Sequence, residues 1–323
     1  MAPYQSRDSS TIFNYQNFDD VFAEIPDCAY DEEVVHEIEQ NKKDLEGLFI
    51  DKVMKLMGIK RPAKFYPPKT NGDLRNLHKA IVESSGAEQS KISALYYVLL
   101  NIDLPTEKRV WSGHFEERAF LPPKYSIFMK GIWHLDRREF QVALQYLTHP
   151  SLIPTFPDEI LELLVRKANG DFSLALAYYH TVQPALTQSS AIQCLFRAIA
   201  ASSVTEAFYF SRGQPEHTKR HLFEFLISLV INNSPKTTIA DRSVELVNLP
   251  LTQEEEAWFQ EYLLHGDGRG LSKSKDTLMM RKIGTGKFTE SLSVKVGNRT
   301  VGGLDWRSLS EAIKDGLGPR SST

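Results

Sequence analysis

The middle of the chain predicts helix after helix, because its apolar residues recur at intervals of three and four. One stripe follows Asp31 and marks one face of a long helix. Its members are Val34, Ile38, Leu45, Leu48, Phe49, Val53 and Leu56. Similar stripes occur at 92–100 and at 222–231, and the second of these is apolar nearly all round, as expected of a buried helix.

A repeat of 32 residues is the strongest internal pattern. The order F-x-x-A-L-x-Y begins at Phe140, recurs at Phe172 and returns in a looser form at Val204. The preceding apolar positions keep the same register, in the columns Phe128/Ile160/Ile192 and Ile132/Leu164/Phe196. Two helices in about 30–45 residues are typical of a helical-hairpin solenoid, and chance matching of Ala-Leu pairs is the alternative. We therefore predict an all-α fold, an irregular α-solenoid of stacked helical hairpins over residues 12–264, clearest at 122–217.

The two ends of the chain differ from this helical region. Residues 1–11 are polar and are predicted to be disordered. Residues 265–323 hold ten of the 18 glycines, and from residue 264 on there are 11 Lys/Arg against six Asp/Glu, which leaves a charge of −8 on residues 1–263. We predict a largely unstructured carboxy-terminal tail here, acting as a linker or a partner-docking segment.

Four apolar residues stand out in this polar tail, and we take them as candidates for burial against a partner. They are Phe288, Leu292, Val294 and Trp306. The alternative is that they form a small cap on the end of the solenoid itself.

The composition of the chain does not indicate a function, but it argues against several classes of protein. Hydrophobic residues make up 41% and charged residues 24%, which is ordinary for a folded chain. The net charge of −3 gives no general reason to expect nucleic-acid binding. Two cysteines 166 residues apart, Cys28 and Cys194, offer no disulfide framework. The most apolar stretch is ten residues long, whereas a membrane span needs about 20.

No motif points to catalysis, a cofactor or a metal. His217 and His221 have the i, i+4 spacing of metal ligands, but a solvated helix start is the simpler interpretation, since two cations separate them. The glycines at 266–270 and 284–286 do not meet the spacing of a dinucleotide or P-loop motif, and no G-x-S-x-G elbow occurs. The basic, aromatic stretch at 60–69 suggests nucleic-acid contact or, more simply, an interhelical loop.

The segment at 119–161 resembles the helical domain of the ELYS family of nuclear pore assembly proteins. Its sequence begins AFLPPKYSIFMKGIWHLDRREFQVALQYLTHP, and the residues that carry the resemblance are Trp133, Asp136, Phe140, Ala143, Leu144, Leu147 and Pro150. A weaker similarity extends from about residue 31 to about residue 264. Trp133 occupies the repeat position of Val165, so we interpret the motif residues as structural.

The resemblance implies a non-enzymatic component of the nuclear pore complex, located in the nucleus at the nuclear envelope. The implied partners are nucleoporins of the Y-shaped outer ring, in particular the large propeller-solenoid subunit and its small β-propeller partner. Long members of the family carry a β-propeller and a chromatin-binding tail with AT-hooks. Neither is expected in this chain, which looks like the short fungal form, so the resemblance gives no support for direct chromatin binding.

Two other functions stay open from the sequence alone. One is a helical-repeat adaptor of another multiprotein complex. The other is a nucleic-acid-binding repeat protein, which the charge of −8 on the helical region disfavours.

Overall fold

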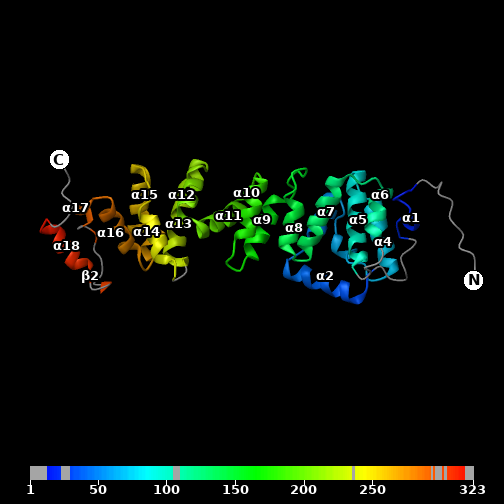
Figure 1. The fold of residues 1–323 in the computed structure, drawn as a ribbon, viewed down its shortest axis with the longest axis horizontal. Helices are drawn as coiled ribbons and strands as arrows, with labels where there is room; N and C mark the ends of the chain where they lie inside the picture. The colour runs from blue at the N-terminus through cyan, green and yellow to red at the C-terminus, as the bar shows by residue number, and fades with distance from the viewer. Residues whose placement is uncertain are drawn as a thin grey trace, which may run out of the picture. The chain divides into compact units, whose positions relative to one another are not determined.

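The computed structural model describes residues 13–22, 30–104, 110–234, 237–291, 294, 300–301 and 304–316 (Figure 1). Within these residues it contains eighteen α-helices, two short 3-10 helices and one hairpin of two-residue strands, so the predicted all-α class is confirmed. The predicted disordered start at 1–11 lies outside the described residues. The chain divides into two compact units, Met1–Pro157 with Ala177–Pro184 and Asp158–Leu176 with Ala185–Thr323.

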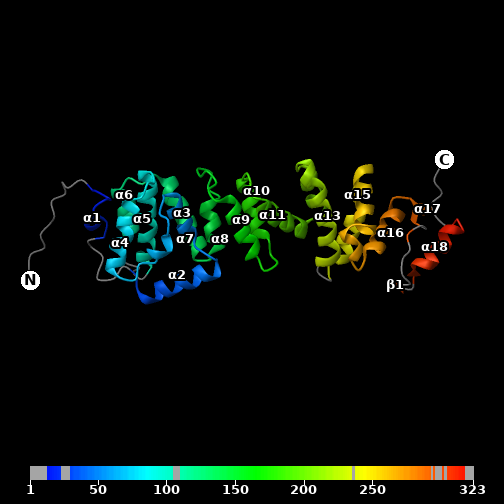
Figure 2. The ribbon, with the colours of Figure 1, turned by 180° about the vertical axis from the view of Figure 1, so that it is seen from behind.

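The first unit is built around one central helix. Its elements are α1 (Phe18–Phe22), α2 (Glu32–Asp44), α3 (Phe49–Leu56), η1 (Pro62–Lys64), α4 (Asn71–Val82), α5 (Glu88–Asp103), α6 (Trp111–Arg118), α7 (Pro123–Asp136) and α8 (Phe140–Leu147). Helix α5 packs against α3, α4, α6 and α7, and ten of its 16 residues are buried. This burial on all sides explains why α5 is apolar around most of its circumference. Figures 1 and 2 show α4, α5 and α6 side by side.

Helices α7 and α8 pack closely because α7 carries a glycine at their contact. A Cβ atom at Gly131 would lie 2.6 Å from the Leu147 side chain of α8, which is closer than real Cβ contacts. Only glycine therefore fits this position without a shift of the Leu147 side chain or of one of the two helices.

Helices occupy both arms of each 32-residue repeat. The pairs are α7 with α8, α9 (Pro157–Arg166) with α10 (Ser173–Val182), and α11 (Ser189–Ser202) with α12 (Val204–Arg212). The repeated alanines Ala143, Ala175 and Ala207 are at most 1% exposed. The residues Ile132, Leu164 and Phe196 of the other column are at most 3% exposed. The repeat is therefore a repeat of core positions.

The second unit is centred on α13 (Glu216–Asn233), which packs against α11, α12, α14 and α15. Its remaining elements are α14 (Ile239–Val247), α15 (Gln253–Leu264), η2 (Asp267–Gly270), α16 (Ser274–Gly284), α17 (Phe288–Ser291), β1 (Thr300–Val301), β2 (Leu304–Asp305) and α18 (Trp306–Lys314). Strands β1 and β2 pair antiparallel. Side-chain caps start three of the helices: Ser203 accepts from the Glu206 backbone before α12, Thr252 forms a capping box with Glu255 before α15, and Asp305 accepts from the Ser308 backbone before α18.

The prediction of a largely unstructured tail from residue 265 is wrong for residues 267–291. Helix α16 packs against both α14 and α15. The guanidinium of Arg281, which is 4% exposed, donates to the carbonyl oxygens of Val247 and Leu249 at 2.6 Å each and to the Glu256 carboxylate. A basic composition indicates a solvated segment only where the cations face water, and this cation is instead buried among fixed acceptors.

Candidate functional site

The carboxyl group of Asp136 joins three helices of the first unit. Asp136 ends α7 and is 4% exposed. Its oxygens accept from the backbone nitrogens of Phe49 at 2.6 Å and Ile50 at 3.0 Å, and from the Tyr97 hydroxyl at 2.8 Å. The residue before α3 is Leu48, which has no side-chain oxygen, so Asp136 supplies the cap of α3 from a distant part of the chain.

Burial is the main influence on the pKa of the Asp136 carboxyl group. Desolvation raises the pKa of Asp136 to about 7, although the N–H groups of Phe49 and Ile50 and the Tyr97 hydroxyl favour the charged form. Burial also raises the pKa of Tyr97 well above its ordinary value, with the Asp136 charge adding to the effect. The Tyr97 hydroxyl therefore remains a donor to Asp136 at every physiological pH.

Trp133 lies one turn before Asp136 and extends the same network. Its indole Nε1 donates to Oδ1 of Asn101 on α5 at 2.9 Å, and Nδ2 of Asn101 donates to the Tyr66 hydroxyl at 3.0 Å. The Arg137 guanidinium lies 5.0 Å from the centre of the indole ring. Trp133 and Asp136, which the sequence analysis names together as motif residues, thus both hold α7 to α5 through side-chain hydrogen bonds.

The other motif residues lie on or just after α8. Phe140 begins that helix and is half-buried, whereas Ala143 and Leu144 are buried. Pro150 is exposed and follows the helix. Leu147, the last residue of α8, is buried, and these five residues do not enter the hydrogen-bond network of Trp133 and Asp136.

The predicted docking residues of the tail have different surroundings. Phe288 begins α17 and is half-buried, and Val294 is 8% exposed. Trp306 begins α18 and is half-buried, and its Nε1 donates to Oδ1 of Asp276 on α16 at 2.9 Å. Leu292 lies outside the described residues. Val294 is therefore buried within its own chain, and Trp306 is hydrogen-bonded to it.

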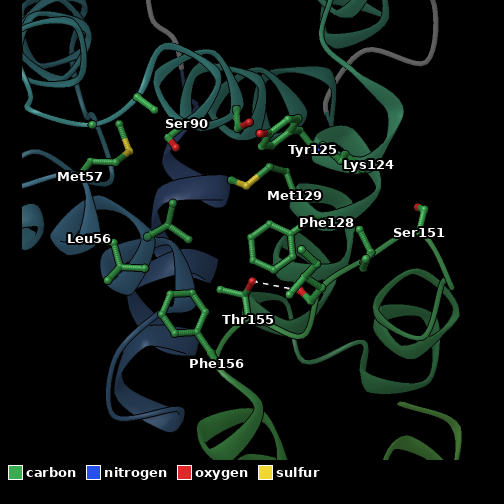
Figure 3. A pocket seen from close by; sticks show the side chains of 16 residues that line it. Leu56, Met57, Ser90, Lys124, Tyr125, Phe128, Met129, Ser151, Thr155 and Phe156 are labelled. Carbon is green, nitrogen blue, oxygen red and sulfur yellow. Dashed lines mark hydrogen bonds between the residues drawn. The ribbon is translucent and has the colours of Figure 1, made fainter. Parts of the chain in front are cut away.

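An apolar groove in the first unit is a feature that sequence reasoning missed (Figure 3). It has a volume of about 380 Å³ and lies among the end of α3, the starts of α5 and α7, and residues 151–156. In Figure 3, Leu56 lies to the left, Phe128 to the right and Phe156 below them. The main apolar side chains that line it are Val53, Leu56, Phe128, Met129, Ile153 and Phe156.

Two of the most exposed large apolar side chains among the described residues line the groove. Leu56 is 72% exposed and Ile153 is 85% exposed. The helical stripe predicted an inward position for Leu56, which is wrong because α3 ends there and the side chain stands at the groove edge. The signal that could have indicated the groove is the loop sequence Ile153-Pro154-Thr155-Phe156, where large apolar residues occur between helices.

The chemistry of the groove suits binding rather than reaction. Lys124 is the one charged residue in its lining, and hydroxyl groups come from Ser90, Ser151 and Thr155 among others. In the part of the chain that the structure describes, no three His, Cys, Asp or Glu residues are grouped to hold a metal ion. No helix among the described residues is long and apolar enough to cross a membrane. His217 and His221 lie exposed on α13.

An all-α fold with a groove lined by apolar side chains is typical of helical protein-interaction domains. The chain belongs to the ELYS family: the family model described as "ELYS: Nuclear pore complex assembly" matches residues 47–266, which include the Asp136 network and the whole groove lining. The resemblance in the sequence is thereby confirmed.

The chain is also similar to two curated proteins. It is 29% identical over 232 residues to "Uncharacterized protein ely5" of Schizosaccharomyces pombe, covering 71% of this chain and 73% of that protein. It is 23% identical over 209 residues to "Protein ELYS" of Xenopus laevis, covering 61% of this chain but 8% of that protein. The similarity to the Xenopus protein therefore concerns one small part of it.

Proposed function

We propose that this chain is a non-catalytic structural nucleoporin that docks on the Y-shaped outer ring of the nuclear pore complex, at the nuclear envelope. Its partners are the large propeller-solenoid subunit of that ring and the small β-propeller beside it. The observation that carries the proposal is the ELYS family match over residues 47–266. The apolar groove supports it, since a groove with exposed leucine and isoleucine side chains suits contact with another protein.

The same proposal includes an α-solenoid arrangement of stacked helical hairpins. It is supported by the three 32-residue repeats, whose alanines 143, 175 and 207 are buried. In this arrangement Trp133, Asp136, Phe140, Ala143, Leu144 and Pro150 have structural roles, and Phe288, Leu292, Val294 and Trp306 contribute to partner contact at the carboxy-terminal end. Solenoids bind through extended surfaces and ends, which fits a scaffold subunit.

Affinity purification of the tagged chain from nuclear envelope extract tests this function. Outer-ring nucleoporins should be recovered in a fixed ratio to the chain, and an extract with the tag alone is the control. Their absence would contradict the proposal and favour an adaptor of another complex. A steep loss of duplex DNA affinity with salt would instead favour a nucleic-acid-binding protein, because phosphate contacts release counterions.

A further inference from the structure

We propose that the groove of the first unit binds an amphipathic α-helix of a partner protein, which inserts bulky apolar side chains and places a carboxylate against Lys124. The inference rests on the proposed function in one respect only, namely that the helix belongs to an outer-ring nucleoporin.

The groove offers apolar surface at two depths. Its floor is formed by Val53 and Met129, which are 9% and 1% exposed. Its edges are formed by Leu56 and Ile153, which are 72% and 85% exposed. Covering such side chains removes apolar area from water, so a ligand with apolar groups of its own is favoured. The volume of about 380 Å³ suits a few side chains rather than a folded domain.

The walls of the groove are preformed. Phe156 has a φ of +58°, a left-handed conformation that is rare for a bulky residue, and its ring packs on Phe49 with centroids 6.3 Å apart. On the opposite wall, Gly86 lets the chain approach Met57, whose Cγ would lie 2.9 Å from a Cβ at that position. A preformed site lowers the conformational entropy that binding costs.

The charges near the groove select an acidic ligand. Lys124 is exposed and is the one charged residue of the lining. Lys55 is exposed on α3 next to Leu56, whereas the single acid of that helix, Asp51, is 8% exposed and pairs with Lys42 at 3.1 Å. Glu88 follows the lining residue Ala87 but does not line the groove itself. Lys55 and Glu88 are both exposed, lie outside the lining and carry opposite charges, so the charge within the groove is that of Lys124, which favours a carboxylate on the ligand.

The backbone of the ligand is expected to be helical. An extended peptide needs a strand edge to satisfy its N–H and C=O groups, and the groove is lined by the ends of three helices and a loop. A helix satisfies its own backbone groups. It also presents apolar residues at i, i+3 or i+4, and i+7 to a groove of this kind.

Selection from a displayed library of random 16-residue peptides, with the full chain as bait, tests the inference. Counter-selection uses the Leu56→Glu/Ile153→Glu double variant, whose substitutions lie at exposed positions and leave the core intact. We expect enrichment of peptides with apolar residues at helical spacing and an Asp or Glu beside them. Lys124→Glu should weaken the selected peptides at least tenfold, and replacing their acid with lysine should restore binding to that variant.

Val142→Glu is the matched control, because Val142 is 37% exposed on α8 and does not line the groove. It should bind the selected peptides like the unaltered chain. Thermal melts of all variants check that the fold is retained. Failure to enrich any peptide that distinguishes the chain from the double variant would overturn the inference. So would sedimentation showing that the chain self-associates through these residues, since a second copy would then fill the groove.

Co-purification separates this inference from the proposed function. If the unaltered chain recovers outer-ring nucleoporins and the double variant does not, the result supports both the proposed function and the groove inference. If the double variant recovers them equally well, the groove inference fails and the function stands. If the unaltered chain recovers none of them while the selected peptides still bind, the function fails and the groove serves another partner.

Discussion

The carboxylate of Asp136 lies 2.6 Å from the backbone nitrogen of Phe49, although 87 residues separate them in the sequence. Through this bond the last residue of α7 supplies the amino-terminal cap of α3. The end of α3 forms one side of the apolar groove and the start of α7 another. The network of Asp136 therefore fixes two of the helices from which the groove is built.

Replacing Asp136 with alanine should destabilise the chain. The variant leaves the N–H groups of Phe49 and Ile50 without their buried acceptor, for a loss of about 2–4 kcal/mol in the free energy of unfolding. Urea denaturation measures this loss. Asp44→Ala is the control, because Asp44 pairs with Arg138 at the surface and should cost less than about 1 kcal/mol. Equal effects of both substitutions would contradict a capping role for Asp136.

The stability of the chain should also depend on pH through Asp136. Burial raises its pKa from 3.8 to about 7, so between these pH values the folded chain holds a proton that the unfolded chain has released. This proton stabilises the folded chain fully below pH 3.8, and the stabilisation is lost as the pH rises through 7. The free energy of unfolding should therefore fall by about 3 kcal/mol between pH 4.5 and 7.5.

The Asp136→Asn variant cannot titrate at this position. Its free energy of unfolding should therefore fall less between pH 4.5 and 7.5 than that of the unaltered chain. Comparing the two proteins cancels the contribution of His78, whose pKa is lowered by burial and whose effect has the opposite sign. Chemical denaturation across the pH range gives both slopes, and parallel slopes would rule out the titration of Asp136.

Gly131→Ala should be destabilising in spite of the higher helix propensity of alanine. The new Cβ would lie 2.6 Å from the Leu147 side chain and would force α7 and α8 apart, with an overpacking loss of about 1–3 kcal/mol. Gly72→Ala is the matched control, since its nearest neighbour would be the Thr70 hydroxyl at 3.6 Å. That substitution should stabilise α4 by about 0.5–1 kcal/mol. Thermal melts that shift in the same direction would be inconsistent with this packing.

Arg281→Ala tests whether α16 is part of the core. Removing the guanidinium leaves the Glu256 carboxylate and the carbonyls of Val247 and Leu249 without their donor, and a loss of about 3–5 kcal/mol is expected. Arg307→Ala removes an exposed pair with Glu311 on α18 and should change stability by less than about 0.5 kcal/mol. A negligible effect of Arg281→Ala on stability would show that residues 274–284 are not part of the packed core.

Local patterns in the sequence predicted the parts of this fold that depend on neighbouring residues. The Thr252–Glu255 capping box and the buried alanines 143, 175 and 207 follow from spacing along the chain. The position of α16 does not, because Arg281 finds its acceptors 25 to 34 residues earlier. The groove could not be predicted from local patterns either, because its lining comes from segments up to about 100 residues apart in the sequence.

The cap of α3 also sets an order of events during synthesis. A ribosome releases the chain from its amino terminus, so residues 49–56 emerge well before Asp136. A helix of eight residues is too short to persist alone in water. The groove of the first unit therefore becomes complete only after α7 and residues 151–156 have left the ribosome, and until then α3 lacks both its cap and the helix that it packs against.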